Sequence, residues 1–201
     1  MSNTSTCYRV LGIDPGLHTT GYGLVRCDGR RFSVEEAGII RPPAKAAMNE
    51  RLVCLHHELR DLIEQTHPDS VAVEQLYSHY AHPRTAILMG HARGVILLAA
   101  GEANLPVYDI PSTKVKKSLT GNGHASKLQM QRTIQGLLSL PKLPEPPDVA
   151  DALAIALCAA RHRLDALLTV GRAPADAALA PAVPTSRPRR RSVHTQFPDP
   201  N

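Results

Sequence analysis

Four acidic residues stand at the ends of apolar segments, where a buried element would ordinarily carry an apolar side chain. Asp14 and Glu74 each close a short apolar run, and Asp148 and Asp151 open the apolar segment 152–157. Burying a lone carboxylate is costly, so three segments that each end in an acid suggest that the acids meet around a shared partner. A hard divalent cation such as Mg²⁺ or Mn²⁺ prefers oxygen ligands. The pattern therefore predicts a metal site that acts on phosphate.

The carboxylates are numerous enough for two-metal chemistry. A pair of divalent ions about 4 Å apart can activate an attacking water and stabilise the leaving oxygen of a phosphodiester. Four carboxylates supply the charge to hold two ions, and the ions keep those carboxylates ionised. No serine, cysteine or histidine nucleophile is then required.

Asp148 and Asp151 also have a purely structural interpretation. They are three residues apart, so a helix places them on one face, and both fall near its positive end. Asp148 would then be an N-cap and Asp151 the acid of a capping box. This alternative explains neither Asp14 nor Glu74.

A basic stretch without any acid lies in the second half of the chain. Between Ile110 and Pro144 there is no aspartate or glutamate, and the cations there are Lys114, Lys116, Lys117, Lys127, Arg132 and Lys142. A site that binds a phosphate backbone beside a metal cluster has this charge pattern. A solvated basic helix face is the alternative. The net charge of +5 says less, because an arginine run near the C-terminus contributes much of it.

The hydrophobic pattern alternates between strands and helices. Strands are predicted over 8–14, 21–27, 32–40, 70–74 and 105–109, and helices over 48–66, 81–101, 111–118, 126–139 and 148–168. Asp28-Gly29 is a strong hairpin signal between the second and third strands. Antiparallel strands followed by helix–strand units predict an α/β fold with a mixed sheet, in which Asp14 and Glu74 fall at the carboxyl ends of strands.

Length and composition predict one domain over residues 1–170. The 201-residue chain has four cysteines without paired spacing, no apolar run of membrane-spanning length and no secretory signal at its N-terminus. We therefore expect a cytoplasmic protein with no membrane partner. Residues 171–201 are rich in proline, alanine and arginine, which predicts a disordered tail.

Five segments, in order, resemble the motifs of the RuvC family of Holliday-junction resolvases: Val10–Gly16, Thr20–Gly23, Val73–Gln75, Gly90–Gly94 and Asp148–Ala154. The resemblance implies a ribonuclease-H-like fold, a five-stranded mixed sheet flanked by helices. It also implies a homodimer that depends on Mg²⁺ or Mn²⁺, with two ions per active site, and resolves four-way DNA junctions during recombination and repair. Paired symmetric nicks would leave 5′-phosphate and 3′-hydroxyl ends. A branch-migration complex, RuvA-RuvB, is the partner that the resemblance implies.

The resemblance also assigns residues. Asp14, Glu74, Asp148 and Asp151 each fall on one of the family's catalytic, metal-binding acids. Five further residues are expected to bind DNA: Tyr77, Lys116, Lys117, Lys127 and Arg132. Lys116 and Lys127 match basic residues near the scissile phosphate, and Tyr77 stands where the family usually has a phenylalanine that inserts at the junction. Lys117 and Arg132 have an equal alternative as solvated charges, and Tyr77 has one as a half-buried surface residue.

Other functions remain open at this point. A ribonuclease-H-like nuclease that acts on RNA would share the acids but not the basic stretch, and a non-catalytic junction-binding protein would be expected to lose an acid. The actin-like ATPases share an acid in such a turn but need a far longer chain. Gly90 and Gly94 lie on one face of the predicted helix 81–101, which permits close packing on the sheet or on a symmetry mate.

Overall fold

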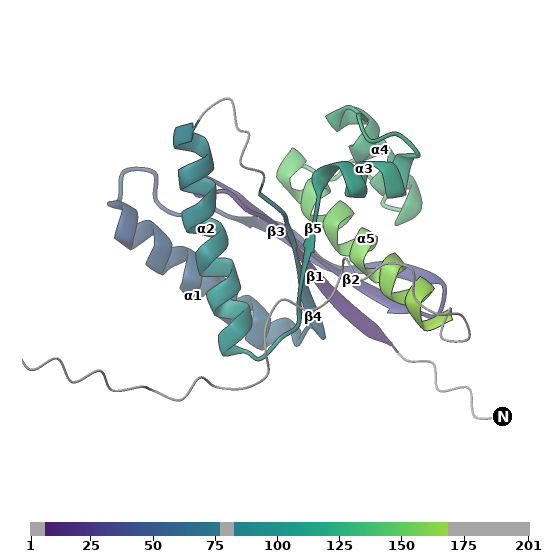
Figure 1. Ribbon diagram of the computed structural model, residues 1–201, viewed down its shortest axis with the longest axis horizontal. Helices are drawn as coiled ribbons and strands as arrows, with labels where there is room; N and C mark the ends of the chain where they lie inside the picture. The colour runs from purple at the N-terminus through teal and green to yellow at the C-terminus, as the bar shows by residue number, and fades with distance from the viewer. Residues whose placement is uncertain (1–6, 77–82, 169–201) are drawn as a thin grey trace, which may run out of the picture.

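The computed structural model describes residues 7–76 and 83–168 (Figure 1). Their elements, in chain order, are β1 (Tyr8–Asp14), β2 (Thr20–Asp28), β3 (Arg31–Ile40), α1 (Met48–Thr66), β4 (Ser70–Glu74), α2 (Pro83–Glu102), β5 (Val107–Ile110), α3 (Ser112–Thr120), α4 (Lys127–Leu137) and α5 (Pro147–Leu168). The predicted tail from residue 171 lies outside the described residues. Within the part of the chain described, no helix is long and apolar enough to cross a bilayer.

The five strands form one mixed sheet in the order β3-β2-β1-β4-β5, which confirms the predicted class. β1 pairs antiparallel with β2 and parallel with β4, and β4 pairs parallel with β5. The predicted hairpin joins β2 to β3 through Gly29, whose positive φ of 59° suits a residue without a Cβ. β5 begins two residues later than predicted, because Pro106 has no N–H to donate; its carbonyl accepts from Val71 at 2.9 Å.

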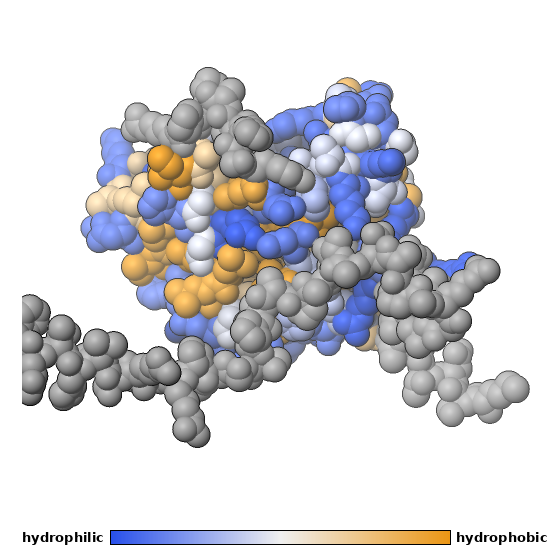
Figure 2. Space-filling view, in the orientation of Figure 1, coloured by the Kyte–Doolittle hydropathy of each residue, from blue (hydrophilic) through white to orange (hydrophobic). Residues whose placement is uncertain are grey.

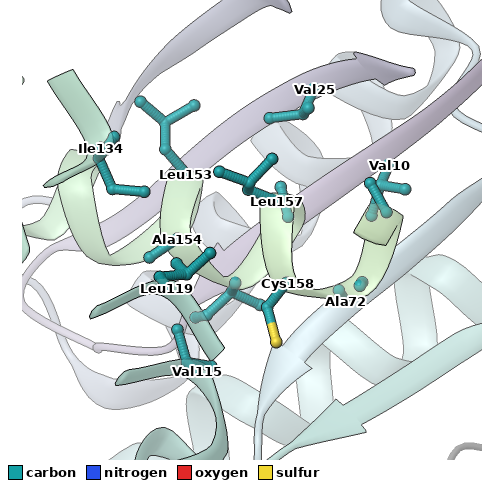
Figure 3. Packing of buried hydrophobic residues seen from close by; sticks show 14 of the residues in the cluster. Val10, Val25, Ala72, Val115, Leu119, Ile134, Leu153, Ala154, Leu157 and Cys158 are labelled. Carbon is teal, nitrogen blue, oxygen red and sulfur yellow. The ribbon is translucent and has the colours of Figure 1, made fainter. Parts of the chain in front are cut away.

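Helices cover both faces of the sheet, as Figure 1 shows. Alternate residues of β1 face opposite sides: Leu11 packs in the cluster that includes Leu55 and Leu59 of α1, and Val10 packs in the cluster on α5. The α5 side is filled by Leu153 and Leu157 of that helix together with residues of α3 and α4 (Figure 3). α5 is therefore the central helix of one layer, and α1 and α2 form the other.

α5 lies unusually close to the sheet because glycine stands beneath it. A Cβ added to Gly12 of β1 would lie 2.5 Å from the backbone nitrogen of Ala156 and 2.8 Å from its Cβ. A Cβ added to Gly23 of β2 would lie 2.6 Å from a methyl carbon of Leu153. At Gly12 the contact is with helix backbone, which cannot give way, so this helix position requires glycine there; at Gly23 the Leu153 side chain could shift. The position of α5 fixes where its first turn meets the sheet.

Candidate active site

Two neighbouring strands end in carboxylates at the same edge of the sheet. Asp14 is the last residue of β1 and Glu74 the last residue of β4. The two strands are parallel, with Ile13 opposite Val73, so the two acids follow side by side. The carboxyl ends of strands are where open α/β sheets assemble their sites.

The first turn of α5 brings two further acids to this edge. Gly21 of β2 is paired with Asp14, and its Cα lies directly against the backbone carbonyl of Asp148. Asp151 follows one turn later and lines the same pocket as Asp14. α5 begins at Pro147, so Asp148 is inside the helix and not its N-cap. The capping-box interpretation of Asp148 and Asp151 is therefore wrong, although the placement near the positive helix end holds.

Asp14, Glu74 and Asp151 share one pocket of about 280 Å³ with two lysines. Its lining residues are Asp14, Glu74, Ser112, Val115, Lys116, Lys127, Met130, Asp151, Ala154 and Ile155. Strands β1 and β4 and helices α3, α4 and α5 all contribute to it. Asp148 is not among the lining residues, but its charge acts on both Asp14 and Asp151.

Asp14 is the acid whose ionisation the site opposes most. Burial, followed by the charges of Asp151, Glu74 and Asp148, raises the pKa of Asp14 from its ordinary 3.8 to about 8, and Lys127 acts in the opposite direction. At neutral pH this carboxyl therefore retains its proton unless a cation stabilises the charged form. The charges of Asp151, Glu74 and Asp148 therefore all act on Asp14 at this edge of the sheet.

The other two acids of the pocket are also hard to ionise. Burial raises the pKa of Glu74, which a hydrogen bond from Ser112 opposes. Burial likewise raises the pKa of Asp151, which Lys127 and then Lys116 oppose while the charge of Asp148 adds to the rise. The two lysines thus partly neutralise a cluster that remains acidic.

The chemistry of this donor set fits a hard divalent cation. The donors are carboxylate oxygens in a half-buried pocket, and a bound cation would replace their repulsion by attraction. No three or more His, Cys, Asp or Glu side chains in the described ranges are arranged so that they could hold a metal ion as they stand. Binding an ion therefore requires these side chains to rearrange. The residues present fit the ion in type, and three of the acids share one pocket.

The structure separates the predicted DNA-binding residues into two groups. Lys116 of α3 and Lys127 at the start of α4 line the pocket. Lys117 and Arg132 are exposed and do not line it. Tyr77 lies outside the described residues, so its role stays a prediction.

Ser112 is a site residue that the sequence did not reveal. It is the first residue of α3, directly after β5, and its hydroxyl hydrogen-bonds Glu74. A serine at the start of a helix is ordinarily interpreted as a cap. The signal that could have revealed Ser112 is that it follows β5, the strand beside β4. That neighbourhood is apparent only once the strand order is known.

The fold and the acidic pocket together define a class of protein, the metal-dependent nucleases with a ribonuclease-H-like fold. The family model described as crossover junction endodeoxyribonuclease RuvC matches residues 10–159. The chain belongs to this family.

Similar proteins agree with this assignment. A crossover junction endodeoxyribonuclease RuvC of Rhodopirellula baltica is 51% identical over 149 residues, which cover 74% of this chain and 84% of that protein. The solved structure of T. thermophilus RuvC in complex with Holliday junction substrate is 33% identical, with a TM-score of 0.74, over 79% of this chain and 96% of that one. The yeast mitochondrial Holliday junction resolvase Ydc2, at 14% identity and a TM-score of 0.56 over 79% of this chain and 82% of that one, shares the fold.

Proposed function

We propose that this protein is an endonuclease that resolves four-way (Holliday) DNA junctions by paired symmetric nicks, which leave 5′-phosphate and 3′-hydroxyl ends. The observation that carries the proposal is the pocket in which Asp14, Glu74 and Asp151 meet Lys116 and Lys127. The family assignment supports the substrate. The T. thermophilus relative, whose structure contains a Holliday junction substrate, supports it further.

In this proposal Asp14, Glu74, Asp148 and Asp151 hold two Mg²⁺ or Mn²⁺ ions. When bound, such ions lower the pKa of an attacking water and stabilise the leaving oxygen. The burial that makes Asp14 hard to ionise also keeps bulk water from screening its charge. Ser112 orients the carboxylate of Glu74 by donating a hydrogen bond to it. Asp148 does not line the pocket, so its part as a ligand rests on the family resemblance; its charge raises the pKa of Asp14 and Asp151.

Lys116 and Lys127 bind the scissile phosphate in this proposal. Both line the pocket, and both lower the pKa of Asp151, which burial raises. Cations placed where negative charge develops stabilise a transition state more than the ground state. Lys117 and Arg132, being exposed beside the pocket, contribute to the general attraction of DNA. Tyr77 stacking at the crossover remains a prediction.

Two symmetric nicks require two active sites, and α2 offers a surface for a homodimer. Ile87 and Leu98 are 60% and 54% exposed on this helix, and nothing lies within 4 Å of a Cβ built on Gly90 or Gly94. Figure 2 shows apolar residues gathered along α2. The homodimer predicts that Leu98→Glu gives a monomer by sedimentation and that this monomer nicks one strand without its symmetric partner. A dimer that survives both Leu98→Glu and Ile87→Glu would place the interface elsewhere.

Incubating purified protein with a synthetic four-way junction, labelled on each strand in turn, tests the proposed activity. We expect symmetric nicks in Mg²⁺ or Mn²⁺, none in chelator, and none with Asp14→Asn. Junction binding by the wild type without nicking in any metal would favour the non-catalytic alternative. Metal-dependent cutting of RNA but not of junctions would favour the RNA nuclease. The RuvA-RuvB complex as partner and a cytoplasmic location stay predictions of the sequence.

A further inference from the structure

A second basic surface lies toward the opposite end of α5 from the acidic pocket. Two adjoining pockets, each of about 570 Å³, share Arg30, Phe32 and Arg161 in their lining. Five cations from the β2–β3 hairpin, α3 and α5 line them, and we call these the hairpin patch: Arg26, Arg30, Arg31, Lys114 and Arg161. The only carboxylate that lines either pocket, among the described residues, is Asp28.

Within the described ranges, three of the five cations of the hairpin patch are in neither an ion pair nor a contact with an aromatic ring. A guanidinium nitrogen of Arg26 lies 3.7 Å from a carboxylate oxygen of Glu35. Arg161 lies over the ring of Phe32, with 5.8 Å between its guanidinium carbon and the ring centroid. Arg30, Arg31 and Lys114 have no ion-pair partner in the described part of the chain. Arg30 and Arg31 are exposed at the tip of the hairpin. Unpaired cations gathered over two adjoining pockets are suited to a polyanion.

The hairpin patch and the acidic pocket both take residues from α3 and α5. On α3, Lys116 lines the acidic pocket and Lys114, two residues earlier, lines the patch. On α5, Asp151 belongs to the pocket and Arg161 to the patch. Ten residues of α-helix span about 15 Å. Measured along the axis of a duplex, where the phosphates of one strand advance by roughly 3.4 Å each, that distance covers about four to five phosphates.

We propose that the hairpin patch binds the phosphate backbone of a junction arm about four to five nucleotides from the nick. The proposal rests on the proposed function and adds a contact outside the acidic pocket. Phosphate contacts hold the register of a duplex without reading its sequence. A second set of cations, carried in part by the helices that line the acidic pocket, would therefore align the arm that enters the pocket. An acidic protein would not require the patch to share α3 and α5 with the nuclease site.

The test measures junction affinity against salt concentration in an Asp14→Asn background, so that no DNA is cut. Arg30→Gln and Arg31→Gln together should reduce the slope of log affinity against log salt by about 0.9 for each phosphate that the protein no longer neutralises. Lys114→Gln should act in the same direction. The matched control is Arg60→Gln, which removes an exposed cation from α1 on the other face of the sheet and should leave the slope unchanged.

Neutral phosphates locate the contact. Methylphosphonates placed four and five nucleotides from the nick site should weaken wild-type binding and have little further effect on Arg30→Gln/Arg31→Gln. An unchanged salt slope in this double variant, with an unchanged thermal midpoint of unfolding, would overturn the proposal and leave the patch for an acidic protein. The proposed function fails separately, when the wild type neither binds nor nicks a junction. If Arg30→Gln/Arg31→Gln nicks junctions as fast as wild type at every salt concentration, the proposed role of the hairpin patch is overturned and the proposed function is not.

Discussion

Gly21 lies so close to the backbone carbonyl of Asp148 that a Cβ at position 21 would overlap it. Because Gly21 is also paired with Asp14 across β1 and β2, this contact sets the separation between the first turn of α5 and the end of β1. The carbonyl is backbone and cannot rotate away. The whole helix end must move to admit a methyl group.

Gly21→Ala should therefore move the acids on α5 away from the acids on β1 and β4. We expect the nicking rate at a limiting Mg²⁺ concentration to fall by at least about tenfold, and the free energy of unfolding to fall by about 1–3 kcal/mol. Raising the Mg²⁺ concentration should recover part of the rate. Gly136→Ala is the control: it lies in α4 with nothing within 4 Å of an added Cβ, so it should be neutral or stabilise by up to about 1 kcal/mol. Equal activity of Gly21→Ala and wild type at limiting Mg²⁺ would contradict the positioning role.

Asp14→Asn should stabilise the metal-free protein in a pH-dependent way. The pKa of Asp14 is raised to about 8 in the fold, so the unfolded chain loses this proton near pH 4 while the folded chain retains it. Stability from this group is present below pH 4 and falls as the pH rises to about 8. The free energy of unfolding of the variant should thus exceed that of wild type by about 1–3 kcal/mol at pH 8 and be similar to it near pH 4.

Magnesium should reverse that order. At pH 8, Mg²⁺ should raise the unfolding temperature of the wild type and have little effect on Asp14→Asn, since an ion stabilises the folded state only where it binds. Calorimetry with and without chelator measures both effects. A variant less stable than wild type at pH 8 in chelator would show that the carboxylates do not repel one another.

The two lysines of the pocket should differ in effect from their exposed neighbour. Lys116→Ala should slow nicking at saturating junction by about 10²-fold, because it removes a cation that would stabilise the reacting phosphate. Lys117→Ala, one residue away and exposed, should weaken junction binding, most strongly at low salt, and leave the saturated rate near that of wild type. Single-turnover kinetics separates the two quantities. A loss of saturated rate in Lys117→Ala equal to that in Lys116→Ala would contradict this division.

Ser112→Ala should make Glu74 harder to ionise, because the hydrogen bond from Ser112 lowers the pKa that burial raises. The acid limb of the pH–rate profile should then move to higher pH, and more Mg²⁺ should be needed for half-maximal rate. Ser112→Thr keeps the hydroxyl and should restore both. A profile that does not move with Ser112→Ala would show that Glu74 does not depend on this serine.

The sequence was sufficient to predict Asp14 and Glu74 because each ends a run of buried residues, and β1 and β4 are indeed neighbours. The sheet class followed from the same runs, since the alternation of strands and helices decides it. The Gly21–Asp148 contact was not predictable, because it depends on how closely α5 crosses the sheet. Ser112 was missed for the related reason that its partner is 38 residues away in sequence and meets it only through the pairing of β4 with β5.

The central claim is that carboxylates from β1, β4 and α5 form one site for divalent ions. Anomalous scattering from crystals grown or soaked with Mn²⁺ tests it most directly. We expect two peaks about 4 Å apart in the pocket bounded by Asp14, Glu74 and Asp151, and their loss in Asp14→Asn. The claim would be contradicted by peaks elsewhere on the protein with none in this pocket. It would also be contradicted if, at saturating Mn²⁺, Lys116 and Lys127 were the only positive charges in the pocket.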